Sequence, residues 1–178
     1  MAKVGIFFGT DTGSTRKMAK LIQKQLGDEI ADKPKNINRV DVEEFTSYEC
    51  LILGTPTLGQ GQLPGLSVDC QEESWEEFLP NFSDMDLTGK KVALYGLGDQ
   101  VSYSNEFVDA LGELYDYVAN CGAEMVGFWP TEGYEFNASN AVDGDDFVGL
   151  VLDKDNQASL TEQRIAGWVE QLTSEMGL

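Results

Sequence analysis

The stretch GTDTGSTRKMA, residues 9–19, decides the fold because it joins a buried strand to an amphipathic helix. The preceding run Val4–Phe8 is continuously apolar, which is typical of a strand covered on both faces. From Thr15 to Leu26 the apolar residues recur at helical spacing, and Gly27 is suited to end the helix. In an open parallel sheet, ligands bind at such a junction, beyond the carboxyl ends of the strands.

This junction loop is dense in hydrogen-bond donors. Its hydroxyls come from Thr10, Thr12, Ser14 and Thr15. Gly13 lets the backbone approach a ligand closely, and the amides of a helix N-terminus add partial positive charge. The loop lacks both the GxGxxG of dinucleotide sites and the lysine of the Walker loop, where Ser14 stands instead. It therefore predicts a phosphate monoester held by hydroxyls and amides, the alternative being ordinary turn and capping residues.

The rest of the chain alternates short apolar runs with amphipathic stretches, which indicates βα units around a parallel sheet. The expected later strands are a weaker one at 36–42, a buried one at 50–53 and a third central one at 91–97. The expected later helices are 107–118 and 161–172, the second with Thr161 as its cap. The runs 125–129 and 147–152 predict a final strand that is split by an inserted loop of about 17 residues, and such a loop in a compact domain usually has a function or a partner.

Composition limits the class of protein. A chain of 178 residues with 42% hydrophobic content suits one domain, residues 1–178, with a single core. Its apolar runs are too short to span a bilayer and its N-terminus lacks a signal sequence, so we expect a soluble cytoplasmic protein. Cys50, Cys70 and Cys121 are odd in number and far apart, which predicts buried thiols rather than a disulfide framework or a zinc site.

The charge is large and unevenly distributed. The net charge is −19, yet residues 1–40 hold eight basic and four acidic side chains, so the remainder carries −23. Such an acidic surface repels nucleic acid and anionic membranes, and it favours fast, salt-sensitive encounters with basic proteins. The alternative is that the acidity serves solubility only.

Two further loops follow central strands of the expected sheet and meet the first loop at the same edge. Gly54–Pro64 and Gly96–Tyr103 offer flexible backbone, and the second ends in an aromatic ring. A phosphate-binding loop beside two such loops suits a flat heterocycle with a phosphorylated tail.

These three loops resemble those of the flavodoxin family, long-chain type, and the likeness extends over essentially the whole chain. It implies an α/β fold with a doubly wound five-stranded parallel sheet of order 2-1-3-4-5, helices on both faces and a last strand interrupted by a long insertion. It also implies non-covalent flavin mononucleotide (FMN). The implied FMN-binding residues are Thr10, Asp11, Thr12, Gly13, Ser14, Thr15, Thr55, Pro56, Thr57, Leu58, Gly59, Gln60, Gly61, Leu97, Gly98, Asp99, Gln100, Tyr103 and Asn105.

Departures from the family pattern concern the flavin faces. Leu58 stands where relatives often have tryptophan, so Tyr103 is the expected main stacking partner. Ser102 replaces a common glycine, and Asn105–Glu106 replaces an acidic-asparagine pair. The resemblance also places the Gly59 carbonyl beside flavin N5, which makes Gly59 the expected redox switch.

The resemblance implies a monomeric, low-potential one-electron carrier whose FMN cycles between semiquinone and hydroquinone. Its expected partners are a reductase or oxidoreductase donor and an acceptor such as nitrogenase reductase. Nearby carboxylates would disfavour the anionic reduced flavin, and the candidates are Asp69, Glu72, Glu73, Glu76, Glu77 and Asp99.

Two other classes of function remain to be compared with the carrier. The sequence has no histidine and no evident nucleophile, general base or metal-ligand set, which argues against catalysis by side chains. The first alternative is an NAD(P)H-dependent quinone or nitro reductase, which needs a basic recess that the acidic rim disfavours. The second is a phospho-accepting receiver domain, for which Gly54–Thr55 and Trp129–Pro130 stand in place of the required aspartate and lysine.

Asp153–Gln157 lacks the glycine and glutamate of a calcium-binding EF-hand, so we expect a turn before a helix.

Overall fold

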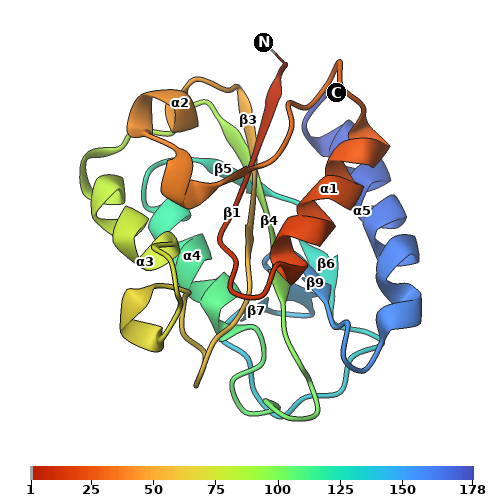
Figure 1. Cartoon of the computed structure of the whole chain (residues 1–178). Coiled ribbons are helices and arrows are strands. Elements are labelled where there is room, and N and C mark those ends of the chain that lie inside the picture. Colours follow the sequence, from red (N-terminus) through yellow and green to blue (C-terminus); the bar gives the residue numbers. More distant parts are fainter. Residues whose placement is uncertain (1) are drawn as a thin grey trace.

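The computed structural model describes residues 2–178, which form a parallel sheet with helices on both faces (Figure 1). The strand order is β2-β1-β3-β4-β5, as predicted, with β9 also paired to β4. The strands of this sheet are β1 (Val4–Phe8), β2 (Lys35–Asn36), β3 (Cys50–Thr55), β4 (Lys91–Leu97), β5 (Glu124–Val126) and β9 (Leu150–Leu152). The α-helices are α1 (Ser14–Leu26), α2 (Val42–Thr46), α3 (Trp75–Phe78), α4 (Asp109–Ala119) and α5 (Thr161–Glu175). The 3-10 helices are η1 (Ile37–Arg39), η2 (Leu66–Val68), η3 (Leu79–Asp84) and η4 (Ala158–Leu160).

The sheet separates two hydrophobic cores. In Figure 1, α1 and α5 cover one face, and α2, α3 and α4 cover the other. Successive side chains of a strand point to opposite faces, so Ile6 packs in the core with α1 and α5 while Phe7 packs in the other. This two-sided burial explains why β1 is apolar at every position. The two chain ends lie close together, and the Lys3 ammonium donates to the Gly177 carbonyl at 3.0 Å.

The fifth strand is split, as predicted. β5 pairs with the first half of β4, at Lys91–Ala93, and β9 pairs with its second half, at Tyr95–Leu97. The intervening chain forms a small antiparallel sheet of β6 (Trp129–Pro130), β8 (Asp146–Phe147) and β7 (Val142–Asp143). The insertion therefore leaves the main sheet and returns to it at the end where the ligand loops are expected.

Three expected boundaries were wrong. The strand expected at 36–42 ends at Asn36, because the Asn36 side chain accepts from the Asn38 amide and begins η1. The helix expected from 107 begins at Asp109, since Val108 has a left-handed φ of 50°. Thr161 is the first residue of α5 and makes no capping hydrogen bond, because η4 runs directly into that helix.

A turn at 86–89 precedes β4, with the Asp86 carboxylate accepting from the Thr88 amide at 2.9 Å. Within residues 2–178, the structure contains no helix of the length and hydropathy needed to cross a membrane.

Candidate functional site

The register of the sheet brings four loops together at one edge. Phe8 lies beside Gly54, Thr55 beside Gly96, and Leu97 beside Leu152. Backbone hydrogen bonds continue this alignment past the strand ends, from the Gly9 amide to the Gly54 carbonyl at 3.0 Å and from the Gly98 amide to the Leu152 carbonyl at 3.2 Å. The loops after β1, β3, β4 and β9 therefore border a common site.

A cleft of about 200 Å³ opens between these loops. Its lining residues are Asp11, Thr12, Ser14, Pro56, Thr57, Leu58, Leu97, Gly98, Asp99, Tyr103, Lys154 and Asp155. Ten of these twelve were predicted from the sequence as ligand-binding residues, and Lys154 and Asp155 were not. The cleft is acidic, because three carboxylates and one ammonium belong to its lining.

The first loop ends in a helix N-terminus whose amides no side chain caps. Gly13 is the N-cap of α1 with a left-handed φ of 96°, a conformation that favours glycine. The Thr10 hydroxyl accepts from the Gly13 amide at 3.0 Å, and the first helical bond runs from the Lys17 amide to the Gly13 carbonyl. The N–H groups of the first helical turn can therefore donate to another acceptor, such as a bound anion. The Thr15 hydroxyl oxygen is buried and has no hydrogen-bond partner among the described residues.

The second loop is a tight hairpin. The Leu58 amide donates to the Gln62 carbonyl at 2.9 Å, and the Gln62 amide returns a bond to the Leu58 carbonyl at 2.8 Å. Gly59 and Gly61 both have left-handed φ values, 49° and 94°. Before the hairpin, the Thr57 hydroxyl oxygen is another buried polar atom without a partner among residues 2–178, whereas the Thr55 hydroxyl donates to the Pro56 carbonyl.

The third loop is organised by Asp99. Its carboxylate accepts from the amides of Val101 at 3.0 Å and Ser102 at 2.9 Å, and its carbonyl accepts from the Tyr103 amide. Partial burial opposes ionisation of Asp99, but the hydrogen bonds from Ser102, Asn156 and Val101 outweigh it and lower its pKa. The loop presents Tyr103, half exposed at 50%, at the edge of the cleft.

A buried carboxylate beneath this loop was missed by the sequence analysis. Asp153, in the turn after β9, accepts from the Gln100 backbone amide at 3.0 Å and from the Gln100 side-chain amide at 2.8 Å. The sequence analysis described 153–157 only as a turn before a helix. The signal that could have identified it is an aspartate directly after an apolar strand with asparagine three residues later, a pattern typical of turns in which the aspartate side chain accepts backbone amides.

Several predicted site residues do not line this cleft. Thr10 and Gly13 line a neighbouring cleft of about 530 Å³ together with Arg16, Lys35 and Arg39. The Gln100 side chain is buried against Asp153, and the Asn105 side chain accepts from the Asn137 side chain in the insertion. The others outside the lining are Thr15, Thr55, Gly59, Gln60 and Gly61.

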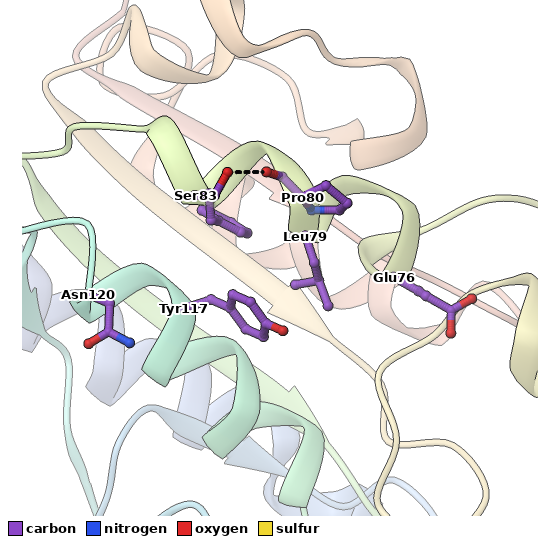
Figure 2. A pocket seen from close by; sticks show the side chains of 7 residues that line it. Glu76, Leu79, Pro80, Ser83, Tyr117 and Asn120 are labelled. Atoms are coloured by element: carbon purple, nitrogen blue, oxygen red, sulfur yellow. Dashed lines mark hydrogen bonds between the residues drawn. The ribbon is translucent and has the colours of Figure 1, made fainter.

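Another groove, of about 470 Å³, lies between η3 and α4, away from the strand ends (Figure 2). Figure 2 shows Leu79 and Tyr117 facing one another while the Glu76 carboxylate points away from them. The Ser83 hydroxyl is used within η3, where it donates to the Pro80 carbonyl at 3.0 Å. This groove therefore has an apolar wall without converging donors, unlike the cleft at the strand ends.

The described part of the chain offers no redox-active disulfide or metal centre. The three cysteines are free and buried, as predicted, and burial raises the pKa of each thiol. No cluster of histidine, cysteine, aspartate or glutamate suited to a metal occurs within residues 2–178.

Known proteins share both the sequence and this architecture. The sequence profile described as Flavodoxin matches residues 6–168. A flavodoxin of Klebsiella pneumoniae is 58% identical over 172 residues, covering 97% of each chain. Flavodoxin 1 of Escherichia coli is 45% identical over 179 residues, covering 100% of this chain and 97% of the relative.

A solved structure agrees with these sequence relatives. The flavodoxin of Fusobacterium nucleatum, solved bound to flavin mononucleotide, has a TM-score of 0.86 and 33% identity, covering 98% of this chain and 99% of that chain. A profile match over most of the chain, relatives of high identity and full length, and a common fold lead to one conclusion: the chain belongs to the flavodoxin family.

Proposed function

We propose that this chain binds one FMN non-covalently in the cleft at the strand ends and carries single electrons at low potential. The observation that carries the proposal is the uncapped N-terminus of α1, with the partnerless buried Thr15 hydroxyl in its first turn. Buried polar groups normally have a partner, so these donors fit an anionic group that completes them. A phosphate monoester, as in FMN, has the charge and the acceptor oxygens that they require.

The remaining residues fit the other parts of FMN. Residues 10–15 would hold the phosphate, and the unpartnered Thr57 hydroxyl suits a polar group of the ribityl chain. Leu58 and Tyr103, both in the cleft lining, would cover the flavin ring and exclude water from it. Asn105 and Gln100 would act indirectly, because their side chains bond to other parts of the protein.

As a flavodoxin, the chain is an electron-transfer protein and not an enzyme. Bound FMN supplies the redox chemistry, and the protein tunes it through its charge and hydrogen bonds. Among the described residues that line the cleft, Asp11, Asp99 and Asp155 are acidic and Lys154 alone is basic, so added negative charge on a cofactor there is disfavoured. This favours use of the more negative of the two one-electron couples of the flavin.

The finer part of the proposal concerns partners. The chain would act as a monomer that takes electrons from a reductase and passes them to a low-potential acceptor such as nitrogenase reductase. Tyr103 lines the cleft together with Asp11, Asp99 and Asp155, and Val101, 71% exposed, lies two residues before Tyr103 in the same loop. The loop therefore offers exposed apolar side chains near acidic ones. Such a surface suits brief docking to a basic partner.

The test compares FMN with riboflavin, which lacks the phosphate. Two hydrogen bonds to a charged phosphate contribute about 3 kcal/mol, so riboflavin should bind roughly 100-fold more weakly. Quenching of flavin fluorescence by the apoprotein measures both dissociation constants. Equal affinity for the two flavins would contradict the phosphate role of residues 10–15.

A matched variant isolates the unpartnered hydroxyl. Thr15→Val keeps the shape of the side chain and removes the oxygen. Because that oxygen has no hydrogen-bond partner within residues 2–178, we expect the apoprotein to lose no stability in urea unfolding. FMN should bind more weakly while riboflavin is unaffected, and a parallel loss for both flavins would argue against a phosphate contact.

A further inference from the structure

Asp153 is a buried carboxylate without a cationic partner. Its exposure is 1%, and no ion pair involving it occurs within residues 2–178. Five donors converge on it instead. The Oδ2 atom accepts from the backbone and side-chain amides of Gln100 and from the Asn156 side chain at 2.9 Å, and the Oδ1 atom accepts from the amides of Asp155 at 3.1 Å and Asn156 at 3.0 Å.

These donors connect two segments that are distant in sequence. Gln100 belongs to the loop after β4, and Asp155 and Asn156 belong to the turn after β9. Gln100 also reaches a third segment, because its Oε1 atom accepts from the Glu135 amide of the insertion at 2.7 Å. Its side chain is thus held on both sides and lies in the protein interior.

Asn156 makes the second link to the same loop. Its side-chain amide donates to Asp153 and also to Asp99 Oδ1, at 2.8 Å. That Asp99 oxygen is the one that accepts from the amides of Val101 and Ser102. Asp153 is therefore connected to the segment that carries Tyr103 by two routes, one through Gln100 and one through Asn156, while the far side of that segment is held where the amides of Asn137 and Ala138 donate to the Ser104 carbonyl.

We propose that Asp153 is a positioning residue for cofactor binding, which fixes the Tyr103 loop in the geometry that receives the flavin. The inference rests on the proposed FMN function. All five groups that contact the Asp153 side chain are hydrogen-bond donors, so both of its terminal atoms must be acceptors. An ionised carboxylate provides this, whereas an amide of the same shape would turn its own NH2 group toward donors.

The experiment uses Asp153→Asn in the full-length apoprotein and holoprotein. We expect FMN to bind about tenfold more weakly, since at least one of the two links to the loop is lost. The visible circular dichroism of the bound flavin should change as the Tyr103 ring moves. In the apoprotein, amide hydrogen exchange should become faster at Gln100 and Ser102, a readout that does not need the cofactor.

Asp155→Asn is the matched control. It removes the same charge two residues away, at an exposed side chain that lines the cleft and makes no side-chain hydrogen bond with residues 2–178. If the two variants weaken FMN equally and leave exchange at Gln100 unchanged, the effect is charge alone and the proposal is overturned. A larger loss and faster exchange only in Asp153→Asn support positioning.

Gln100→Met provides a second test should Asp153→Asn fail to fold. It removes both side-chain bonds of Gln100 and keeps the charge of Asp153 and the backbone bond. We expect weaker FMN binding of a similar order together with altered flavin dichroism, and wild-type values for both would overturn the proposal. If the wild-type apoprotein itself does not bind FMN, the proposed function fails, which is a different result from a variant that binds as well as wild type.

Discussion

Gly59 has a φ of 49° in a hairpin closed by the Leu58 and Gln62 backbones. A Cβ atom there would lie 2.9 Å from the Gln62 Oε1 atom, so both conformation and space favour glycine. The peptide rotation expected of this redox switch requires a positive φ at Gly59. The φ of Gly59 lies in that left-handed region, which favours glycine at this turn.

We expect Gly59→Val to shift the first one-electron potential of bound FMN to more negative values. A β-branched residue resists the left-handed region by about 1–2 kcal/mol, which corresponds to roughly 40–90 mV for one electron. The expected cause is that valine disfavours the backbone conformation in which the carbonyl of residue 59 points toward the protonated N5 of the flavin. Spectroelectrochemical titration of the holoprotein measures the shift.

Gly144→Val is the control for backbone strain, because Gly144 also has a positive φ, 64°, in the insertion and has no atom within 4 Å of the added Cβ. It should lower stability without moving the potential. An unchanged first potential in Gly59→Val, together with weaker binding of oxidised FMN, would mean that Gly59 only avoids a clash.

Asp153 and Gln100 show which residues of the site sequence reasoning reaches and which it does not. Residues 10–15 could be selected from the sequence as a candidate phosphate loop because their hydroxyls and Gly13 are adjacent in sequence and the loop follows a clear strand. The pairing of Gln100 with Asp153 spans 53 residues, and nothing local in either segment specifies it. It depends on β9 returning beside β4, which only the tertiary structure shows.

The insertion between β5 and β9 is tied to the sheet through Tyr134. Its hydroxyl donates to the Val151 carbonyl in β9 at 2.6 Å and accepts from the Trp129 indole at 3.1 Å. Its ring packs on Phe107 and Phe147, and the Arg164 guanidinium of α5 lies 4.1 Å from its centre. One side chain thus joins the insertion, the split strand and the last helix.

Tyr134→Phe should lower the free energy of unfolding by about 1–3 kcal/mol, because it leaves a buried carbonyl and an indole N–H without their partner. Urea unfolding at neutral pH measures the change. Tyr117→Phe is the control, since Tyr117 is 37% exposed and its hydroxyl makes no hydrogen bond with the rest of residues 2–178. A loss in Tyr134→Phe no larger than in the control would contradict the role of the hydroxyl.

The same tyrosine makes stability depend on alkaline pH. Burial raises the pKa of Tyr134 to about 12, while the nearby Arg164 and the Trp129 hydrogen bond act in the opposite direction. The unfolded chain loses this proton from about pH 10, before the folded protein does, so stability falls as pH rises from roughly 10 to 12. In Tyr134→Phe, the free energy of unfolding measured with urea should fall less between pH 9 and pH 11 than in the wild type. An equal fall in the two proteins would show that Tyr134 is not the cause.

Other elements differ in how far sequence predicts them. β1, β3, β4 and α1 were predictable because continuous apolar runs and helical periodicity are strong local signals. The short β2 was overestimated, because the apolar Ile37 belongs to a 3-10 turn capped by Asn36. α2 and α3 were not predicted at all, since helices of one turn are stabilised mainly by packing, here of Phe45 and Trp75 in the core.

The charge of the whole molecule predicts salt-dependent electron transfer. With a net charge of −19, encounter with a basic partner should slow by about tenfold or more as salt rises from low to high concentration. Stopped-flow measurement at several ionic strengths checks this. A rate that does not change with salt, while the partner remains folded, would mean that the acidity serves solubility only.

Charge reversals locate the docking face. Glu72 and Glu73 are exposed, and Glu72 borders the cleft shared by Thr10 and Gly13. Glu76 is unsuitable, because its carboxylate accepts from Ser67 and helps to hold the loop before α3. Reversal of Glu72 and Glu73 to lysine should slow the encounter several-fold more than reversal of Asp28 and Glu29, near the far end of α1. Equal effects would mean that only net charge matters.

The dependence of the third loop on Asp153 also has a consequence for biosynthesis. A ribosome makes the chain from its N-terminus, so the phosphate loop, the hairpin and the Tyr103 loop all emerge before the carboxylate that positions the last of them. A nascent chain that stops short of Asp153 lacks the carboxylate that accepts from Gln100 and the Asn156 amide that donates to Asp99, although Ser104 can still accept from the amides of Asn137 and Ala138. If Asp153 positions this loop as proposed, we expect tight cofactor uptake only after translation has passed β9, and we expect a product truncated before Asp153 to retain the flavin poorly.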